Sequence, residues 1–445
     1  MTFTWAARGS RWAAAAAVAL ALWASAAPTL VYPVYAAQWH LTTAVTTTVF
    51  AAYPVALIAT LLLLGGLAET VGNRGAILAG LGFLGLGALT FLLAPNLALL
   101  LVGRALMGVG VGLSLGPATS VIAASGSDDA RDRTGATTAA ASAVGLITAL
   151  LVGGATVQFS PSPLHAGYGV LLAGVVVAVL AAWFLPRRPS AAARRWRPRP
   201  LAVPRHRLPF VAGALGVSAA YALGAIFLGI GAQFARDTVH SDDAFVNGVV
   251  LAISAAAIGV VALLAGRLRA ATALRLGAVA ALAGQSLMLV AGATHSMTAL
   301  VLYSLIGGAG YSLLFSGGVT LITRSAPAEH RAATTSSAYL VAYLVQAGVA
   351  LAVGRLATAH GLQTALVVGS ATVIAFTLAA VLTARTRGAE PATPAAPLDA
   401  VPVDAVPVDA VPVDAVPVDA VPVDAVPSDT ADLDTTPHHL MKASS

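Results

Sequence analysis

Long apolar runs alternate with short polar segments along residues 12–384 of the chain. A run of about 20 apolar residues is the length that a helix needs to cross a bilayer. Because lipid offers no hydrogen bonds to the backbone, each run should be helical. The pattern predicts an all-α membrane protein with twelve transmembrane helices, near residues 12–35, 43–64, 76–94, 97–124, 134–157, 166–185, 209–234, 244–265, 272–293, 297–322, 332–353 and 364–384.

The first apolar run has a second interpretation. Arg8 and Arg11, a following run of alanines and the segment Ala24-Ser-Ala-Ala27 are typical of a secretory signal peptide with its cleavage site. The apolar run continues past Pro28 to Tyr35, however, and further runs follow without a soluble domain. We therefore favour a first transmembrane helix.

Basic residues are distributed unevenly among the polar segments. Of the 24 Lys and Arg, 21 fall in segments that share a side of the membrane with the N-terminus. Arg236 and Arg355 fall on the other side, and Arg104 lies inside the fourth run. Since cytoplasmic loops carry an excess of basic residues, we expect a multi-pass plasma-membrane protein with both termini in the cytoplasm.

Three short motifs recur at an offset near 200 residues. Gly108-Val-Gly-Val-Gly112 is similar to Gly308-Ala-Gly-Tyr-Ser312, Arg133–Thr138 to Arg331–Thr335, and Gly65-Gly-Leu67 to Gly266-Arg-Leu268. The repeat predicts two pseudo-symmetric six-helix halves, residues 1–185 and 209–387, with a site between them. The Arg-rich cytoplasmic linker, residues 186–208, either binds anionic lipid headgroups or is a solvated loop.

Residues 388–445 have a different composition. Asp-Ala-Val-Pro-Val recurs from Asp399 to Asp424, and the proline of each unit blocks both helix and sheet. We expect a disordered, acidic tail. The tail either folds back onto the basic segment Arg187–Arg207 or is an inert repeat expansion.

Composition excludes several kinds of site. The chain has no cysteine, so disulfides and thiolate metal sites are excluded. Its one lysine, Lys442, follows no glycine-rich loop, which excludes a Walker-type phosphate site. No nucleophile–base pair or metal-ligand cluster occurs in or beside the apolar runs. We therefore expect no enzyme activity, no catalytic residues, no metal, no cofactor and no nucleic-acid partner.

The segment between the second and third runs reads Gly65-Gly-Leu-Ala-Glu-Thr-Val-Gly-Asn-Arg74. Glycines suit a tight turn, and the Glu69 carboxylate could cap a helix N-terminus or pair with Arg74. The segment resembles the signature loop of the major facilitator superfamily, Gly-x-Leu-Ala-Asp-Arg-x-Gly-Arg-Arg/Lys, from which it departs at Glu69, Thr70 and Asn73. The resemblance implies a cytoplasmic gate made by Gly65, Leu67, Glu69, Gly72 and Arg74; the alternative is a topogenic loop with an incidental ion pair.

Arg104 lies inside the fourth run, where a charge is costly and commonly functional. Arg104-Ala-Leu-Met-Gly-Val-Gly-Val-Gly112 resembles the family's fourth-helix motif, Arg-x-x-x-Gly-x-Gly, which implies substrate or proton handling by Arg104. Alternatively, the side chain snorkels to the outer surface.

The fifth run contains Gly145-Leu-Ile-Thr-Ala-Leu-Leu-Val-Gly-Gly154, which resembles the family's antiporter motif without its Gly-Pro pair. Small residues at this spacing also let helices approach closely. The helix-packing candidates in the two runs are Gly108, Gly110, Gly112, Gly145, Gly153 and Gly154.

The predicted spans contain no Asp or Glu. A carrier of cations needs a buried counter-charge, so the chain should favour anionic or neutral amphiphiles. Arginine does not titrate in practice, so proton coupling would use Glu69, the inner acids Asp128, Asp129 and Asp132, or the substrate itself.

The family resemblance implies a cavity lined mainly by the first, fourth, seventh and tenth helices. The polar and aromatic candidates there, with two from the eleventh helix, are Tyr32, Tyr35, Arg104, Tyr221, Gln233, Tyr303, Tyr311, Tyr343 and Gln346. Each could instead be an interfacial anchor or a packing residue.

The resemblance implies a secondary active transporter that works by alternating access. We expect a monomer, surrounded by membrane lipids, that exports a small organic or drug-like compound, with or without exchange for protons. The alternatives are a uniporter or symporter that imports a metabolite and, from another class, a non-transporting sensor that signals through its tail.

Overall fold

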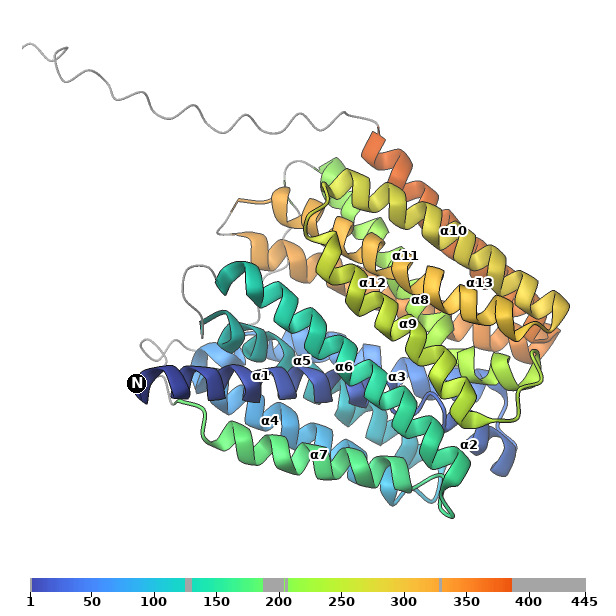
Figure 1. Cartoon of the computed structure of the whole chain (residues 1–445), viewed down its shortest axis with the longest axis horizontal. Helices are drawn as coiled ribbons and strands as arrows, with labels where there is room; N and C mark the ends of the chain where they lie inside the picture. Colours follow the sequence, from blue (N-terminus) through green and yellow to red (C-terminus); the bar gives the residue numbers. More distant parts are fainter. Residues whose placement is uncertain (1, 125–129, 187–203, 205–206, 328–329, 386–445) are drawn as a thin grey trace, which may run out of the picture. The chain divides into compact units, whose positions relative to one another are not determined.

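The computed structural model describes residues 2–124, 130–186, 204, 207–327 and 330–385. Most of the Arg-rich linker, the whole repeat tail and the acids Asp128 and Asp129 lie outside these ranges. The described chain forms thirteen α-helices (Figure 1): α1 (Thr2–Ala26), α2 (Tyr32–Gln38), α3 (Thr43–Leu64), α4 (Leu67–Leu92), α5 (Leu97–Ala124), α6 (Ala130–Phe159), α7 (Ala166–Trp183), α8 (Arg207–Asp237), α9 (Ala244–Ala265), α10 (Ala270–Thr294), α11 (Met297–Arg324), α12 (Arg331–His360) and α13 (Leu362–Arg385).

The prediction of an all-α membrane protein is confirmed. Eleven of these helices, α3 to α13, are long and apolar enough to cross a membrane. The predicted first span, residues 12–35, is wrong as one continuous helix, because α1 ends at Ala26 and α2 begins only at Tyr32. Pro28 lacks an N–H and disfavours the helical conformation of the residue before it, which accounts for the break.

The signature segment, residues 65–74, is mostly helical, whereas the sequence predicts a loop up to the third span at residue 76. The polypeptide turns at Gly65 and Gly66, and α4 starts at Leu67. Gly72 interrupts α4 with φ 76° and ψ 161°, a backbone conformation that residues with a Cβ rarely adopt. Gly72 is therefore the position in this segment at which the backbone requires glycine.

The long helices pack in two groups, which we call the N-terminal group (α1–α7) and the C-terminal group (α8–α13). The same pairs recur in both: α4 packs on α5 as α10 packs on α11, and α1 packs on α5 and α6 as α8 packs on α11 and α12. Between the groups, α6 packs along α9 and α3 along α12 (Figure 1).

Glycines set the close approach of helices at matching positions in the two groups. A Cβ on Gly110 would meet the Gly80 carbonyl oxygen of α4, and one on Gly310 would meet the Ala281 nitrogen of α10. Likewise, a Cβ on Gly108 would meet the backbone of α3 at Tyr53, and one on Gly308 the backbone of α9 at Ser254. Both pairs are offset by about 200 residues, as the repeated motifs are.

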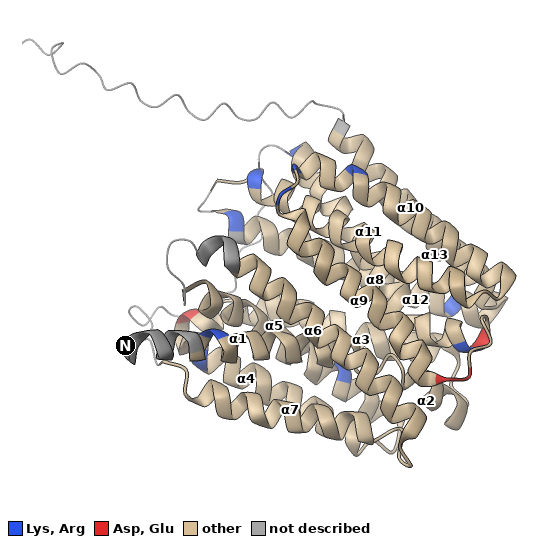
Figure 2. Ribbon diagram, in the orientation of Figure 1, with Lys and Arg blue, Asp and Glu red and all other residues tan. Residues whose placement is uncertain are grey.

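Most charged residues lie toward the two ends of the helices (Figure 2). We call the end that carries residues 65–74 the signature end. The turn between α9 and α10, with Arg267 and Arg269, lies at this end. So do the end of α11 at Arg324 and the start of α12 at Arg331. The opposite end carries Arg236 and Arg355 together with three acids, Asp237, Asp242 and Asp243.

Candidate functional site

A cavity of about 1210 Å³, which we call the vestibule, lies between the two groups of helices. The N-terminal group lines it mainly with α3, α4, α5 and α6, and the C-terminal group with α8, α9, α11 and α12. Gly65, Leu67, Glu69, Gly72 and Asn73 lie at its rim. The vestibule therefore opens at the signature end.

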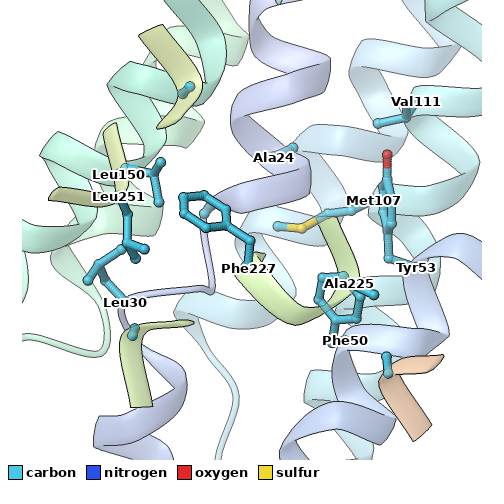
Figure 3. Packing of buried hydrophobic residues seen from close by; sticks show 14 of the residues in the cluster. Ala24, Leu30, Phe50, Tyr53, Met107, Val111, Leu150, Ala225, Phe227 and Leu251 are labelled. Atoms are coloured by element: carbon cyan, nitrogen blue, oxygen red, sulfur yellow. The ribbon is translucent and has the colours of Figure 1, made fainter. Parts of the chain in front are cut away.

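A smaller cavity of about 130 Å³, the deep pocket, adjoins the vestibule. The two share six lining residues, Leu22, Leu146, Tyr221, Ile258, Tyr311 and Tyr343. The deep pocket is further lined by Ser25, Phe50, Tyr53, Phe227, Ser254, Tyr303 and Gln346, among others. In Figure 3 the Phe227 ring points between the two groups, toward Leu150 and Leu251. Both groups therefore contribute walls to the deep pocket.

Hydrogen bonds between the two groups hold the opposite end together. The Thr29 hydroxyl donates to the Leu228 carbonyl at 3.1 Å, and the Gln233 amide donates to the Thr43 hydroxyl at 3.2 Å. Arg236 donates to the Pro33 carbonyl at 3.1 Å, and the Ala244 N–H donates to the Gln158 side chain at 2.8 Å. In this conformation the described residues therefore join the two groups at the opposite end, whereas the vestibule opens at the signature end.

Helix packing also closes the opposite end. A Cβ on Gly154 of α6 would lie 2.7 Å from the Ala244 carbonyl oxygen of α9, and one on Gly248 would lie 2.6 Å from the Leu150 carbonyl oxygen. On the other flank, a Cβ on Gly354 of α12 would overlap the Thr47 side chain of α3. The two groups are thus in backbone contact between α6 and α9, and Gly354 of α12 packs against the Thr47 side chain of α3.

Aromatic rings dominate the cavity wall of the C-terminal group. The Tyr221 and Tyr343 rings meet edge to face, with centroids 4.7 Å apart and planes at 80°. Phe315 lies 6.3 Å from Tyr311 and 6.2 Å from Tyr339, in both cases nearly parallel. Among the described residues that line the two cavities, Glu69 at the rim is the one charged side chain. The cavity wall of the C-terminal group is thus largely aromatic, and the charge in the described lining is confined to Glu69 at the rim.

Arg104 lies behind the cavity wall of the N-terminal group rather than in it. Its side chain is fully buried and is absent from the lining of both cavities. Its Nη1 donates to the carbonyls of Ala24 and Ser25 at 3.3 and 3.1 Å, in the last turn of α1. Its guanidinium also lies 4.7 Å from the Tyr53 ring centroid. Arg104 therefore does not snorkel, and it supports the cavity residues Ser25 and Tyr53.

Free carbonyls at the end of a helix carry partial negative charge and accept hydrogen bonds. The break of α1 before Pro28 supplies such carbonyls next to Arg104. They stand in for the carboxylate that a buried guanidinium ordinarily requires. Nε and Nη2 of Arg104 have no hydrogen-bond partner among the described residues.

Glu69 and Arg74 occupy different surroundings at the rim. Glu69 lies in the first turn of α4, where the helix dipole favours a negative charge, and it lines the vestibule. The Arg74 guanidinium lies 5.3 Å from the ring centroid of Trp183 in α7. Glu69 thus faces the mouth of the vestibule, while Arg74 fastens α4 to a helix of its own group.

The glycines of the fourth and fifth predicted spans lie at helix contacts. Gly108 and Gly112 face α3, and Gly110 faces α4. Gly145 of α6 lies against the α1 backbone at Ala19, Gly153 lies near Leu30, and Gly154 lies against α9. Five of the six glycines lie in close helix contacts, and Gly153 makes an ordinary contact with Leu30 in the segment between α1 and α2.

The structure brings five of the predicted cavity residues together and leaves the others elsewhere. Tyr221, Tyr303, Tyr311, Tyr343 and Gln346 line the deep pocket. Gln233 lies in the contact at the opposite end, while Tyr32 and Tyr35 are buried outside both cavities.

Sequence reasoning missed Ser25, Phe50, Tyr53, Phe227, Ser254 and Tyr339, which line one of the cavities. The family resemblance directed attention to four helices, and Tyr343 and Gln346 were added from α12, whereas α3 and α9 contribute to the lining as well. A signal was present for two of the missed residues. Tyr53 and Ser254 are related by the offset of the internal repeat.

Residues 12–347 match the family model described as Major Facilitator Superfamily. No curated protein sequence matches the chain. Solved structures with the same fold include a mutant form of the nucleoside transporter NupG, at 13% identity and a TM-score of 0.67, over 84% of this chain and 99% of that one. A bacterial homolog of the human lysosomal transporter Spinster, in an inward-facing and occupied conformation, matches at 16% identity and a TM-score of 0.68, over 85% and 96%. The peptide transporter POT in complex with sulfate matches at 16% identity and a TM-score of 0.69, over 84% and 93%.

Proposed function

We propose that this chain, which belongs to the major facilitator superfamily, exports uncharged amphiphilic compounds by alternating access. Membership of the family makes it a multi-pass membrane transporter rather than an enzyme. The observation that carries the proposal is the cavity between the two groups of helices, which opens at the signature end, has a largely aromatic wall on the C-terminal side and has Glu69 at the rim as the one charged side chain among its described lining residues.

The proposal assigns twelve spans to the chain, with α1 as the span beyond the eleven apolar helices. The two groups of helices then correspond to two six-helix halves, residues 1–185 and 209–387, that rock about the cavity. Support comes from the helix pairs and glycine contacts that recur in both groups. The arginines at the signature end support a cytoplasmic location for that end, in a protein that we assign to the plasma membrane. The conformation is then inward-facing.

The charge of the substrate is inferred from the residues that line the cavities. Sequence reasoning favours anionic or neutral substrates because Arg104 is the one charge inside the predicted spans. In the structure the Arg104 guanidinium lies behind Ser25 and Tyr53 and does not line the cavities. The proposal therefore narrows to neutral compounds. Apolar walls favour amphiphiles, which enter cells through the bilayer unaided, so a carrier is useful to the cell chiefly for export.

Glu69 is assigned the coupling role if export is driven by protons. It is the one titratable acid among the described residues that line the vestibule, and arginine does not release its proton in practice. Protonation of Glu69 would remove a charge at the rim at the point where the two groups must approach each other to close it. Glu69→Gln is then expected to transport without regard to a proton gradient.

Transport by purified protein in proteoliposomes tests the proposal. Neutral, anionic and cationic amphiphiles of similar size are compared with and without a proton gradient. We expect movement of the neutral compounds, and a loss of about tenfold or more in Tyr343→Ala, which removes the ring that contacts Tyr221. Phe184→Ala is the matched control, since the Phe184 ring is 85% exposed. Movement of cations alone, or equal loss in both variants, contradicts the proposal.

A further inference from the structure

The size of the deep pocket limits what it can hold. Its volume is about 130 Å³. An apolar cavity of roughly 150 Å³ in another protein binds benzene. The deep pocket is therefore matched to one six-membered ring, whereas the adjoining vestibule, at about 1210 Å³, accommodates a much larger group.

Aromatic side chains from both groups of helices line the deep pocket. Phe50 and Tyr53 of α3 face it from the N-terminal group, and Tyr221, Phe227 and Tyr303 from the C-terminal group. Aromatic pairs are most stable in edge-to-face or offset arrangements, and walls that already present both edges and faces favour an aromatic guest over an aliphatic one. The pocket thus selects for a flat, unsaturated ring.

One polar group in the wall lacks a partner. The Gln346 side chain is 8% exposed, and its Oε1 has no hydrogen-bond partner among the described residues. A carbonyl oxygen only accepts hydrogen bonds, so its missing partner is a donor. The Ser25 hydroxyl already donates to the Leu22 carbonyl at 2.7 Å. A bound compound with an O–H group could donate the hydrogen bond that Oε1 of Gln346 lacks.

The wall also limits the charge of the guest. Among the described residues, those that line the deep pocket include no Asp, Glu, Lys, Arg or His. Placing a charged group there without a counter-ion is costly. A phenol satisfies all these requirements, because it is flat, is the size of one ring, donates a hydrogen bond and is uncharged at neutral pH.

We propose that the deep pocket binds a phenolic ring of the substrate, with the phenol hydroxyl donating to Oε1 of Gln346. This inference rests on the proposed export function and names the substrate class: neutral compounds with an exposed phenol, whose remaining part lies in the vestibule. Tyr221 and Tyr343 line both cavities and would therefore contact both parts of such a compound.

Ligand-observed fluorine NMR with the full chain in lipid nanodiscs tests the inference. The probes are 4-fluorophenol and 4-fluoroanisole, which differ in the hydrogen-bond donor, and empty nanodiscs correct for partition into lipid. We expect saturable line broadening with 4-fluorophenol and at least about tenfold weaker binding of 4-fluoroanisole. Equal affinity for the two probes overturns the inference, whatever any variant shows.

Two variants locate the binding. Gln346→Leu should abolish the preference for 4-fluorophenol. Gln363→Leu, a change of the same kind at an exposed position of α13, should retain it. A preference that survives in Gln346→Leu overturns the assignment of Gln346. If neutral amphiphiles are transported but no phenol is preferred, this inference alone fails. If the phenol binds but nothing is transported, the proposed function alone fails.

Discussion

Arg104 shows how one residue can be singled out correctly and still be placed in the wrong environment. A charge inside an apolar span identified it from the sequence. Its surroundings depend on the break of α1, which frees the carbonyls of Ala24 and Ser25 for its Nη1. That contact joins residues about 80 positions apart, so the pattern of α5 alone could not predict it.

Replacement of Arg104 should therefore affect stability more than selectivity. Arg104→Gln removes charge-assisted hydrogen bonds to α1 and is expected to lower the free energy of unfolding by about 2 kcal/mol. The preference for neutral over charged compounds should stay unchanged. A reversible unfolding titration in SDS and the proteoliposome assay measure the two effects.

Arg355→Gln is the control for this change, since Arg355 is exposed on α12. The contrary result is that Arg104→Gln keeps the stability of the protein but gains or loses transport of a class of charged substrate. Arg104 would then contact the substrate, and the conclusion that it does not line the cavities would be wrong.

Gly72 and Gly65 match the same family signature but for different physical reasons. Gly72 has φ 76° and ψ 161°, a region that is nearly restricted to glycine. Gly65 has φ −58° and ψ −22°, which any residue adopts. Gly72→Ala should lower the free energy of unfolding by about 1–3 kcal/mol, and Gly65→Ala by much less, in the same SDS titration. An equal loss in both variants would show that the backbone at Gly72 is not the cause.

At the scale of the helix, the positions at which helices pack closely are the same in the two groups. Gly108 and Gly308 each lie against a neighbouring helix, at Tyr53 of α3 and at Ser254 of α9. Gly108→Val and Gly308→Val are both expected to cost about 1–3 kcal/mol, since the neighbouring backbone cannot move aside easily. Thermal unfolding in detergent measures both.

Gly82→Val serves as the control for these two variants, because a Cβ at Gly82 has no neighbour within 4 Å. Loss of stability in only one of Gly108→Val and Gly308→Val would contradict the shared register.

Helix positions were largely predictable from the sequence, whereas their interruptions were not. The apolar runs predict α3, α5 and α9 at the residues where these helices lie. Hydropathy reports the length available for a span, but it does not report where the backbone bends. For this reason the break before Pro28 and the helical start of α4 at Leu67 differ from the predictions.

At the scale of the whole molecule, the candidate site forms only where distant helices converge. Tyr221 and Tyr343 were predicted because they are polar aromatic residues in apolar spans, and they line both cavities. Phe50 was missed because nothing in its own helix distinguishes a ring that faces a cavity from one that fills a core. The distinction depends on the spacing between the two groups of helices.

The central claim is that access to the cavities alternates between the two ends of the molecule. The contact of Gly354 with Thr47 helps to close the opposite end, so Gly354→Leu should hold that end open and shift the protein toward an outward-facing state. The chain has no cysteine, which permits single reporters. Ser120→Cys reports on the vestibule, where Ser120 is exposed, and Thr29→Cys reports on the opposite end, where Thr29 is 2% exposed.

The most direct measurement is labelling of these two cysteines by a membrane-impermeant maleimide, applied from each face of the membrane. The account predicts that Ser120→Cys reacts from the cytoplasmic face and Thr29→Cys is protected. In the Gly354→Leu background the first should become protected and the second should react from the outer face. Gly348→Leu, on the same helix with no neighbour within 4 Å of its added Cβ, should change neither. Unchanged labelling of both cysteines in Gly354→Leu would contradict alternating access in this chain.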